Sequence, residues 1–230
     1  MGDRTAAKVD LGAFVFSTHR VPDELLAPLR PSWDRLPVDP YLAEGYRRRR
    51  FSRFAVHADR LEALPVRPIY QTAEHNHLWG DVHRTFEPIE DEVLGHPAFG
   101  ALCDHYLACL PCPRDGLFLR AHQIRIVHDH EFGLDGVPDP EGPHREGGRL
   151  IVGILPVTIV GLTPGTPRLI RTADQPPVFD RVLEPGELLL MNDDDVLHTT
   201  EPFASVDDRP AHRDIFLLTV TDDEAVGTVL

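Results

Sequence analysis

The chain has 230 residues, of which 37 are acidic and 23 are lysine or arginine, and its formal charge is −14. This charge argues against a nucleic-acid-binding protein, because the molecule as a whole would repel phosphates. The hydrophobic content of 42% fits one globular domain, and no apolar stretch reaches the ~18 residues that a membrane span needs. The N-terminus, MGDRTAAKVD, has no apolar signal core, so we expect a cytoplasmic protein.

The first part of the chain carries helical patterning. Residues 22–30 (PDELLAPLR) and 92–110 place apolar side chains at helix-like spacing. Between them the basic run YRRRRFSRF, residues 46–54, alternates arginines with Phe51 and Phe54. This alternation favours an extended segment, solvated or lining a site; the alternative is a local basic patch for nucleic acid. We predict a helical N-terminal layer over about residues 20–112.

Two cysteines at the end of the second helical segment form a Cys109-x-x-Cys112 pair. A redox-active pair of this kind opens a helix after a strand, whereas this one follows a helix and is interrupted by Pro111. The chain has only three cysteines, too few for a disulfide framework, so we expect ordinary reduced thiols.

Beyond residue 116 the pattern changes to short strands separated by Gly, Pro and Asp clusters. The predicted strands are 117–128, 149–160, 167–172, 186–192 and 213–220. Their spacing is typical of a sandwich or barrel. We predict a single domain, residues 1–230, that is mainly β with N-terminal helices and has a double-sheet core over about residues 116–222.

A histidine and a glutamate lie two residues apart in PDPEGPHREGG, residues 138–148, just before the apolar run RLIVGILPV. Side chains at positions i and i+2 of an extended chain point to the same face, so His144 and Glu146 can bind one ion. A third ligand is His198, which follows the apolar run ELLLMN where the next strand is expected. Two histidines and one carboxylate leave one side of an ion open, as in non-haem Fe(II) oxygenases.

Pairs of this spacing also arise by chance, because the chain has 13 histidines and 37 acidic residues. Similar pairs occur at residues 75–77 and 128–130, and we interpret them as polar loop or surface residues. The three predicted ligands differ from these pairs, because each lies where a strand meets a turn and an arginine follows downstream.

That arginine is Arg213, which opens the predicted strand RDIFLLTV. A dicarboxylate cosubstrate that chelates iron with one end needs a cation for its far carboxylate, and a guanidinium offers a two-pronged match. The alternative is a surface ion pair between Arg213 and Asp214 or Asp180.

Four blocks of sequence resemble the bacterial 2-oxoglutarate- and iron-dependent dioxygenases that include isoleucine 4-hydroxylase and related free-amino-acid hydroxylases. The blocks are YLAEGYRRRRFSRF (41–54), YQTAEHNHLWGDVHRTFEPI (70–89), HQIRIVH through PEGPHREGG (122–148), and DDDVLHTT (193–200) with RDIFLLTV (213–220). The family motif Pro-Glu-Gly-x-His-x-Asp-Gly is matched by PEGPHREG, with Glu146 in place of aspartate. The segment TIVGLTPGTPRL, residues 158–169, departs from the family, which more often has paired glycines there.

The resemblance implies a double-stranded β-helix, a jelly-roll or cupin-like core, with Fe(II) held by the two histidines and Glu146. It also implies that Arg213 binds 2-oxoglutarate and that O2 is the second cosubstrate. Gln123 and Arg125, two positions apart on one strand face, are expected to line the same cavity and to assist in cosubstrate binding.

The resemblance further implies that the enzyme hydroxylates an unactivated carbon of a free amino acid or amino-acid derivative and releases succinate and CO2. A zwitterion that enters a cavity needs one cationic and one anionic partner. Arg84 and Glu141 are candidates for these roles, and Gln71 and Asn76 are further substrate-binding candidates. Alternatively, Arg84 braces Glu87 or the N-terminal layer, and Glu141 only caps the turn before the metal motif.

A non-catalytic jelly-roll protein that binds a metal or small molecule is the alternative in another functional class, with Glu146 as a sign of drift from such enzymes. The retained His144, His198 and Arg213 favour the enzyme. The expected partner is a small-molecule substrate, not nucleic acid or a membrane.

Overall fold

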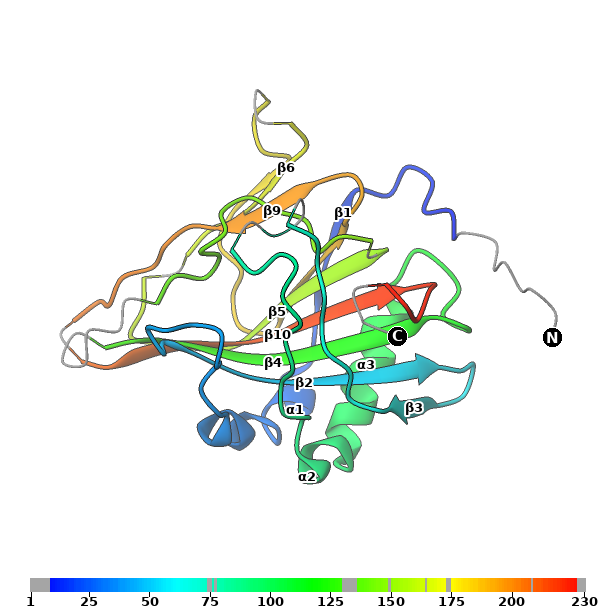
Figure 1. Cartoon of the computed structure of the whole chain (residues 1–230), viewed down its shortest axis with the longest axis horizontal. Helices are drawn as coiled ribbons and strands as arrows, with labels where there is room; N and C mark the ends of the chain where they lie inside the picture. Colours follow the sequence, from blue (N-terminus) through cyan, green and yellow to red (C-terminus); the bar gives the residue numbers. More distant parts are fainter. Residues whose placement is uncertain are drawn as a thin grey trace.

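The computed structural model shows two antiparallel sheets that face each other, with helices on the outer side of the larger sheet (Figure 1). It describes residues 9–73, 76, 78–129, 136–148, 150–163, 165–172, 175–207 and 209–226. Residues 75, 77 and 130, which belong to the chance histidine pairs, lie outside the described residues.

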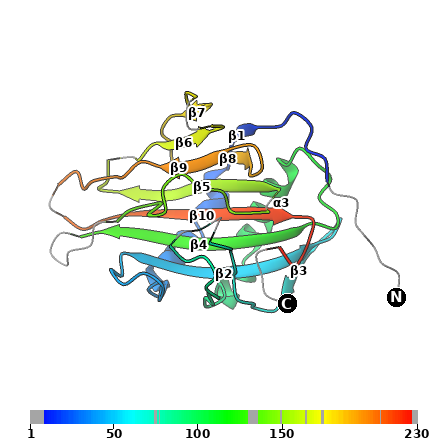
Figure 2. The same cartoon turned by 45° about the horizontal axis from the view of Figure 1, so that its top comes forward.

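The larger sheet has seven strands among the described residues. Their order is β1 (Phe16–Arg20), β8 (Glu187–Asn192), β5 (Ile151–Val160), β10 (Ala211–Thr221), β4 (Phe118–His128), β2 (Arg47–Val56) and β3 (Leu61–Leu64). The smaller sheet has the order β7 (Phe179–Asp180), β6 (Pro167–Ile170) and β9 (Leu197–Thr200). The mainly-β prediction and all five predicted strands are confirmed, and Figure 2 shows the strands of the larger sheet side by side.

Helices cover the outer face of the larger sheet. They are α1 (Asp23–Leu26), the 3-10 helix η1 (Arg30–Arg35), α2 (Asp91–Leu94) and α3 (Pro97–Ala108). The predicted helical N-terminal layer, about residues 20–112, also contains two strands, because β2, at the run predicted to be extended, and β3 lie within it and extend the sheet.

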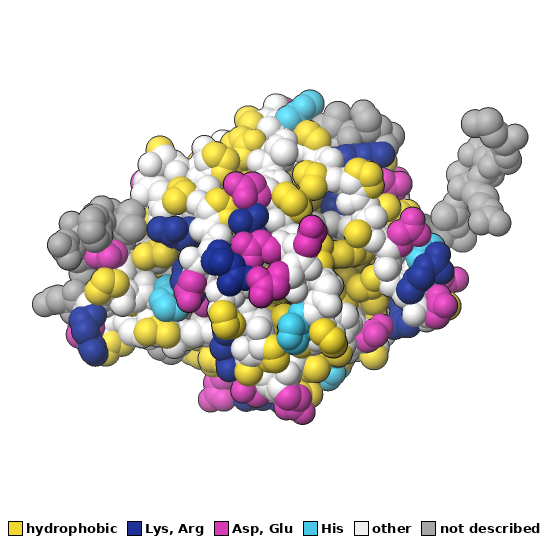
Figure 3. Space-filling view, turned by 90° about the horizontal axis from the view of Figure 1, so that it is seen from below, with side chains coloured by type: hydrophobic (Ala, Val, Ile, Leu, Met, Phe, Trp, Pro, Cys, Tyr) yellow, Lys and Arg dark blue, Asp and Glu magenta, His cyan; other side chains and the backbone are white. Residues whose placement is uncertain are grey.

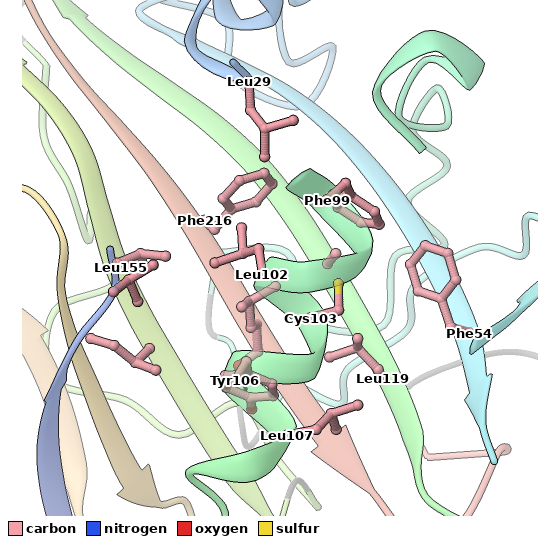
Figure 4. Close-up of a cluster of buried hydrophobic side chains, with 14 of the residues drawn as sticks. Leu29, Phe54, Phe99, Leu102, Cys103, Tyr106, Leu107, Leu119, Leu155 and Phe216 are labelled. Carbon is pink, nitrogen blue, oxygen red and sulfur yellow. Dashed lines mark hydrogen bonds between the residues drawn. The ribbon is translucent and has the colours of Figure 1, made fainter. Parts of the chain in front are cut away.

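Helix α3 anchors this layer on the sheet. Pro97 occupies its first turn, where a missing N–H is harmless, and the ring of His96 accepts a hydrogen bond from the backbone of Ala98. Leu102 and Tyr106 then point from α3 into the main apolar cluster (Figure 4). The Tyr106 hydroxyl donates to the carbonyl of Leu218 on β10 at 3.1 Å. The three cysteines are free thiols that pack in or against this cluster.

The extended conformation predicted for the basic run is confirmed by β2, and Arg47, Arg49 and Arg53 on this strand are buried. The run therefore does not form a basic surface. On the face seen in Figure 3, basic and acidic side chains lie next to one another.

The inner face of the larger sheet positions side chains in rows across neighbouring strands. Arg213 on β10 pairs with Ile126 on β4, which pairs with Arg47 on β2, and Arg49 lies one row further along. Strands lie about 4.8 Å apart, so the backbones of Arg213 and Arg47 are separated by about 10 Å. The segment between β3 and α2 crosses this inner face (Figures 1 and 2).

Within the described part of the chain, no helix has the length and apolar character that a membrane crossing requires.

Candidate active site

A cavity lies between the two sheets and is rich in ionisable side chains. Its walls come from β2, β4, β5 and β10 of the larger sheet, from β9 of the smaller sheet, and from the loops around residues 69–84 and 138–146. The ionisable residues that line it are Arg47, Arg49, Arg84, His122, Asp139, Glu141, His144, Glu146, His198 and Arg213.

The three predicted metal ligands meet at one point of this cavity. His144 and His198 form an antiparallel bridge, in which each backbone N–H donates to the other residue's carbonyl at 3.0 and 2.9 Å. The Nε2 atoms of both histidines lie 3.8 Å from Glu146 Oε1. One ligand atom from each of the three residues lies within 4.8 Å of the others.

Hydrogen bonds to the surrounding chain orient these ligands. His144 Nδ1 lies 2.8 Å from the carbonyl of Gly142, so Nδ1 carries the proton and Nε2 faces the other ligands. The backbone N–H of Glu146 donates to Asp193 Oδ1 at 2.9 Å. Gly142 and Gly147 adopt positive φ angles of 71° and 75°, which glycine tolerates without strain, and these turns flank the short extended stretch that carries both ligands.

The charges of the three ligands are strongly coupled. Burial opposes a charge on His144, but the carboxylates of Glu146, Glu141 and Asp139 outweigh it and raise the pKa of His144 to about 10. Burial likewise opposes ionisation of Glu146, yet the two facing histidines hold the pKa of that carboxyl well below its ordinary value. For His198, burial and then the neighbouring His144 lower the pKa to about 3. Without a metal the cluster is therefore a protonated His144 beside an ionised Glu146, with His198 neutral.

This donor set fits a divalent first-row metal. Two ligand atoms that each lie about 2.1 Å from one ion can be at most about 4.2 Å apart, and both contacts to Glu146 meet that limit at 3.8 Å. Two imidazoles and one carboxylate grouped on one side are the ligands that Fe(II) has in non-haem oxygenases. Glu146 therefore occupies the carboxylate position despite its extra methylene group.

Arg213 projects into the cavity from β10 and is only 4% exposed. Among the described residues no carboxylate lies within 4.0 Å of its guanidinium, and its Nε has no hydrogen-bond partner. Burial lowers its pKa to about 10, with Asp139 opposing. The surface alternative for Arg213 is wrong, because Asp214 pairs with Arg125 and Asp180 pairs with Arg168.

Gln123 and Arg125 share a face of β4, as predicted, but it is the face turned away from the cavity. Gln123 donates to the hydroxyl of Ser32, and Arg125 pairs with Asp214 and Asp34 on the helical side. The expectation that these two residues line the cosubstrate cavity is therefore corrected. The alternation along β4 instead turns His122, Ile124 and Ile126 inward.

The predicted substrate-binding residues all line the cavity. Arg84 Nη2 donates to Gln71 Oε1 at 2.6 Å, and Asn76 Nδ2 donates to the same oxygen at 3.3 Å. Arg84 does not brace Glu87, which pairs with Arg50. Glu141 Oε1 lies 3.7 Å from His144 Nε2, while its other oxygen is buried without a hydrogen-bond partner.

Sequence reasoning missed Arg49 and His122 as cavity residues. Arg49 Nη2 lies 2.6 Å from His122 Nδ1, and its guanidinium lies 4.1 Å from the centre of the Phe86 ring. Burial is the main cause that lowers the pKa of Arg49 to about 9, and it also holds the pKa of His122 well below its ordinary value. For Arg49, the sequence feature that could have indicated this position is the two-residue period of YRRRRFSRF, which gives alternate arginines a common face.

Comparisons with known proteins agree with this geometry. The profile of the 2OG-Fe dioxygenase family matches residues 30–219. A crystal structure of a BsmA homologue from Methylobium petroleophilum is 28% identical, with a TM-score of 0.74 over 91% of this chain and 89% of that chain. A search of curated proteins finds no match.

Two further solved structures share the fold at lower identity. IDO from Bacillus thuringiensis is 18% identical, with a TM-score of 0.63 over 87% of this chain and 86% of that one. TqaL, an Fe(II)/α-ketoglutarate-dependent dioxygenase, is 15% identical, with a TM-score of 0.63 over 90% and 78% of the two chains. The predicted double-stranded β-helix is therefore confirmed.

Proposed function

Because the chain belongs to the 2OG-Fe dioxygenase family, we propose that this Fe(II)- and 2-oxoglutarate-dependent enzyme hydroxylates a free amino acid or a close derivative on an unactivated side-chain carbon. Succinate and CO2 are the products of the cosubstrate. The observation that carries the substrate proposal is a buried cation, Arg84, and a largely buried anion, Glu141, in the same cavity as the ligand cluster.

His144, Glu146 and His198 would hold the iron. When bound, Fe(II) and 2-oxoglutarate supply O2 activation coupled to oxidative decarboxylation, which no side chain can perform. The protein contributes a fixed ligand geometry. The bond from His144 Nδ1 to Gly142 and the bond from the Glu146 backbone to Asp193 hold two of the three ligands.

Arg213 would bind the distal carboxylate of 2-oxoglutarate. A buried guanidinium without an ion-pair partner is unfavourable, and a carboxylate in the cavity would satisfy it with charge-assisted hydrogen bonds. Ile215 and Leu217 follow Arg213 on the inner face of β10 and line the same cavity, where they exclude water from the bound cosubstrate.

The zwitterionic head of an amino acid would lie between Arg84 and Glu141. Gln71 and Trp79 fix the Arg84 guanidinium, the first by a hydrogen bond and the second by a ring face 5.6 Å away. Glu141 keeps one buried oxygen without a partner, which an ammonium group can satisfy. With its charged head held in this way, the apolar side chain of the amino acid is left to face the metal ligands.

The experiment is a substrate panel. Purified protein with Fe(II), ascorbate and 2-oxoglutarate is incubated with free amino acids, short peptides and carrier-bound amino acids, and succinate and product masses are measured. We expect succinate release together with a mass gain of one oxygen in a free amino acid. Oxidation of peptides or carrier-bound substrates alone would reject the free-amino-acid proposal and leave the dioxygenase intact.

A further inference from the structure

Besides Arg213, which we assign to 2-oxoglutarate, three further arginines line the cavity: Arg47, Arg49 and Arg84. Arg47 is paired with the buried Asp39, with 3.0 Å between Nε and Oδ2. Arg49 is 3.8 Å from the same oxygen, and Arg84 has no carboxylate within 4.0 Å among the residues that the structure describes. When Arg213 binds 2-oxoglutarate, the wall formed by β2 and the neighbouring loop therefore still carries an excess of positive charge.

Arg49 is held in one orientation by three neighbours. Its Nη2 contacts His122 Nδ1, its planar group lies over Phe86, and its Nη1 is near Asp39. The residue is 7% exposed and lines the cavity, yet its Nε has no hydrogen-bond partner. Such a buried donor on an immobilised guanidinium is suited to a planar anion that enters the cavity.

The partner of Arg49 also determines how His122 presents its ring. A guanidinium can only donate hydrogen bonds, so Nδ1 of His122 is the acceptor and the proton of the neutral imidazole is on Nε2. The ring stacks on Phe51 with centroids 4.4 Å apart, which fixes its plane. His122 lines the cavity and therefore offers a second, neutral donor beside Arg49.

The position of Arg49 separates it from the proposed cosubstrate arginine. Arg213 and Arg47 share a row across β4, and Arg49 lies two residues further along β2, so the backbones of Arg213 and Arg49 are about 12 Å apart. Arg49 and Arg84, by contrast, line the same cavity with guanidinium groups that lie over Phe86 and Trp79, and the charge of Arg84 contributes to the lowered pKa of Arg49. The two arginines thus form one anion-binding wall, distinct from Arg213.

We infer that Arg49, oriented by His122 and acting with Arg84, is the specificity-determining residue that binds a free carboxylate on the primary substrate. This inference rests on the proposed function and deepens it. An amino-acid amide or ester presents no anion to this wall, and a carrier thioester presents none either. The enzyme accordingly discriminates against substrates whose carboxyl group is blocked.

The test compares R49M, R49K and the control R48M with the wild type. Methionine replaces a buried, weakly paired charge by an apolar chain of similar length, so R49M is expected to fold, and thermal melting checks this. Arg48 is the adjacent arginine on β2 and points to the opposite side of the sheet, where it lines a surface hollow with Asp34 and Arg125. The substrates are whichever free amino acid the panel identifies and its amide.

For R49M we expect the Michaelis constant for the amino acid to rise about 10-fold to 100-fold, with that for 2-oxoglutarate within about threefold of wild type. The preference for the amino acid over its amide should collapse in R49M, persist in part in R49K, and be unchanged in R48M. An equal or larger effect of R49M on 2-oxoglutarate would overturn the inference and assign Arg49 to the cosubstrate.

An unchanged preference for the acid over the amide in R49M would also overturn it, while the proposed function would stand. If no free amino acid is oxidised by the wild type, the proposed function fails, and this inference fails with it. Should R49M not fold, R49K decides by the same comparison, because it keeps the charge but loses the planar donor pair. An R49K enzyme with wild-type constants for both acid and amide would then contradict the inference.

Discussion

His198 is the ligand whose removal separates metal binding from folding most cleanly. Its ring is neutral, its Nδ1 has no hydrogen-bond partner, and its backbone bonds to His144 do not depend on the side chain. We expect His198→Ala to lower turnover by more than about 100-fold while the fold persists, because losing a residue that only hydrogen-bonds to a metal ligand already costs up to about 100-fold. Succinate release and a melting curve measure the two effects.

Glu146→Asp is the matched variant for the metal site. It keeps the carboxylate and shortens it by one methylene, so we expect it to retain part of the activity that His198→Ala loses. Wild-type turnover in His198→Ala would argue against His198 as a ligand. Complete loss of turnover in both Glu146→Asp and Glu146→Gln would indicate a strict distance requirement at Glu146.

Arg213→Ala should weaken 2-oxoglutarate far more than the primary substrate. Loss of a buried charged partner costs about 2–5 kcal/mol, which corresponds to a rise in the Michaelis constant of roughly 30-fold to several thousand-fold. Arg125→Ala is the control on the opposite sheet face: it should lower the melting temperature, because the buried Asp214 loses its partner, and leave cosubstrate binding unchanged. The reverse pattern would assign the cosubstrate to Arg125.

At the scale of single elements, the strands were predictable and the direction of their faces was not. The two-residue period placed Gln123 and Arg125 together on β4, but only packing against the helical layer decides which set of alternate residues faces the cavity. The same limit applied to β2. Its arginines were correctly assigned to an extended segment, yet Arg49 became a cavity residue only through its neighbours on β4 and the loop.

The contact between β5 and α3 gives a prediction about stability. A Cβ atom at Gly153 would lie 2.6 Å from Tyr106 Cε2 and 3.2 Å from Leu190 Cδ2, so Gly153→Ala should lower the free energy of unfolding by about 1–3 kcal/mol. Gly100 lies within α3 with nothing inside 4 Å of its added Cβ, so Gly100→Ala should raise it by about 0.5–1 kcal/mol. Denaturant titrations measure the free energy of unfolding of both variants. Equal changes in Gly153→Ala and Gly100→Ala would contradict the close packing at Gly153.

At the scale of the whole molecule, the metal site joins two segments that are distant in sequence. His144 and His198 are 54 residues apart (198 − 144) and meet only because the loop before β5 pairs with β9. The residue types and their strand-end positions predicted this cluster correctly. The two-residue period of the basic run gives alternate arginines a common face, but the contact between Arg49 and His122 depends on the register of β2 against β4, which no local pattern encodes.

A ligand cluster that is charged and buried should couple metal binding to folding. Iron at 100 times its dissociation constant stabilises the native state by about 2.7 kcal/mol, which raises the melting temperature of a chain of this size by roughly 5–10 °C. Anaerobic melting with Fe(II) and after chelation measures this shift. His198→Ala should show little or none of it, and a full shift in that variant would place the metal elsewhere.

The most direct test of the proposed reaction follows the two atoms of O2. Wild-type protein is incubated with Fe(II), 2-oxoglutarate, the amino acid identified by the panel, and oxygen-18 gas. We predict one labelled oxygen in the hydroxylated amino acid and one in succinate, with the two products formed in equal amounts, and neither product with His198→Ala. Succinate without a labelled amino acid, or equal product from the variant, would contradict it.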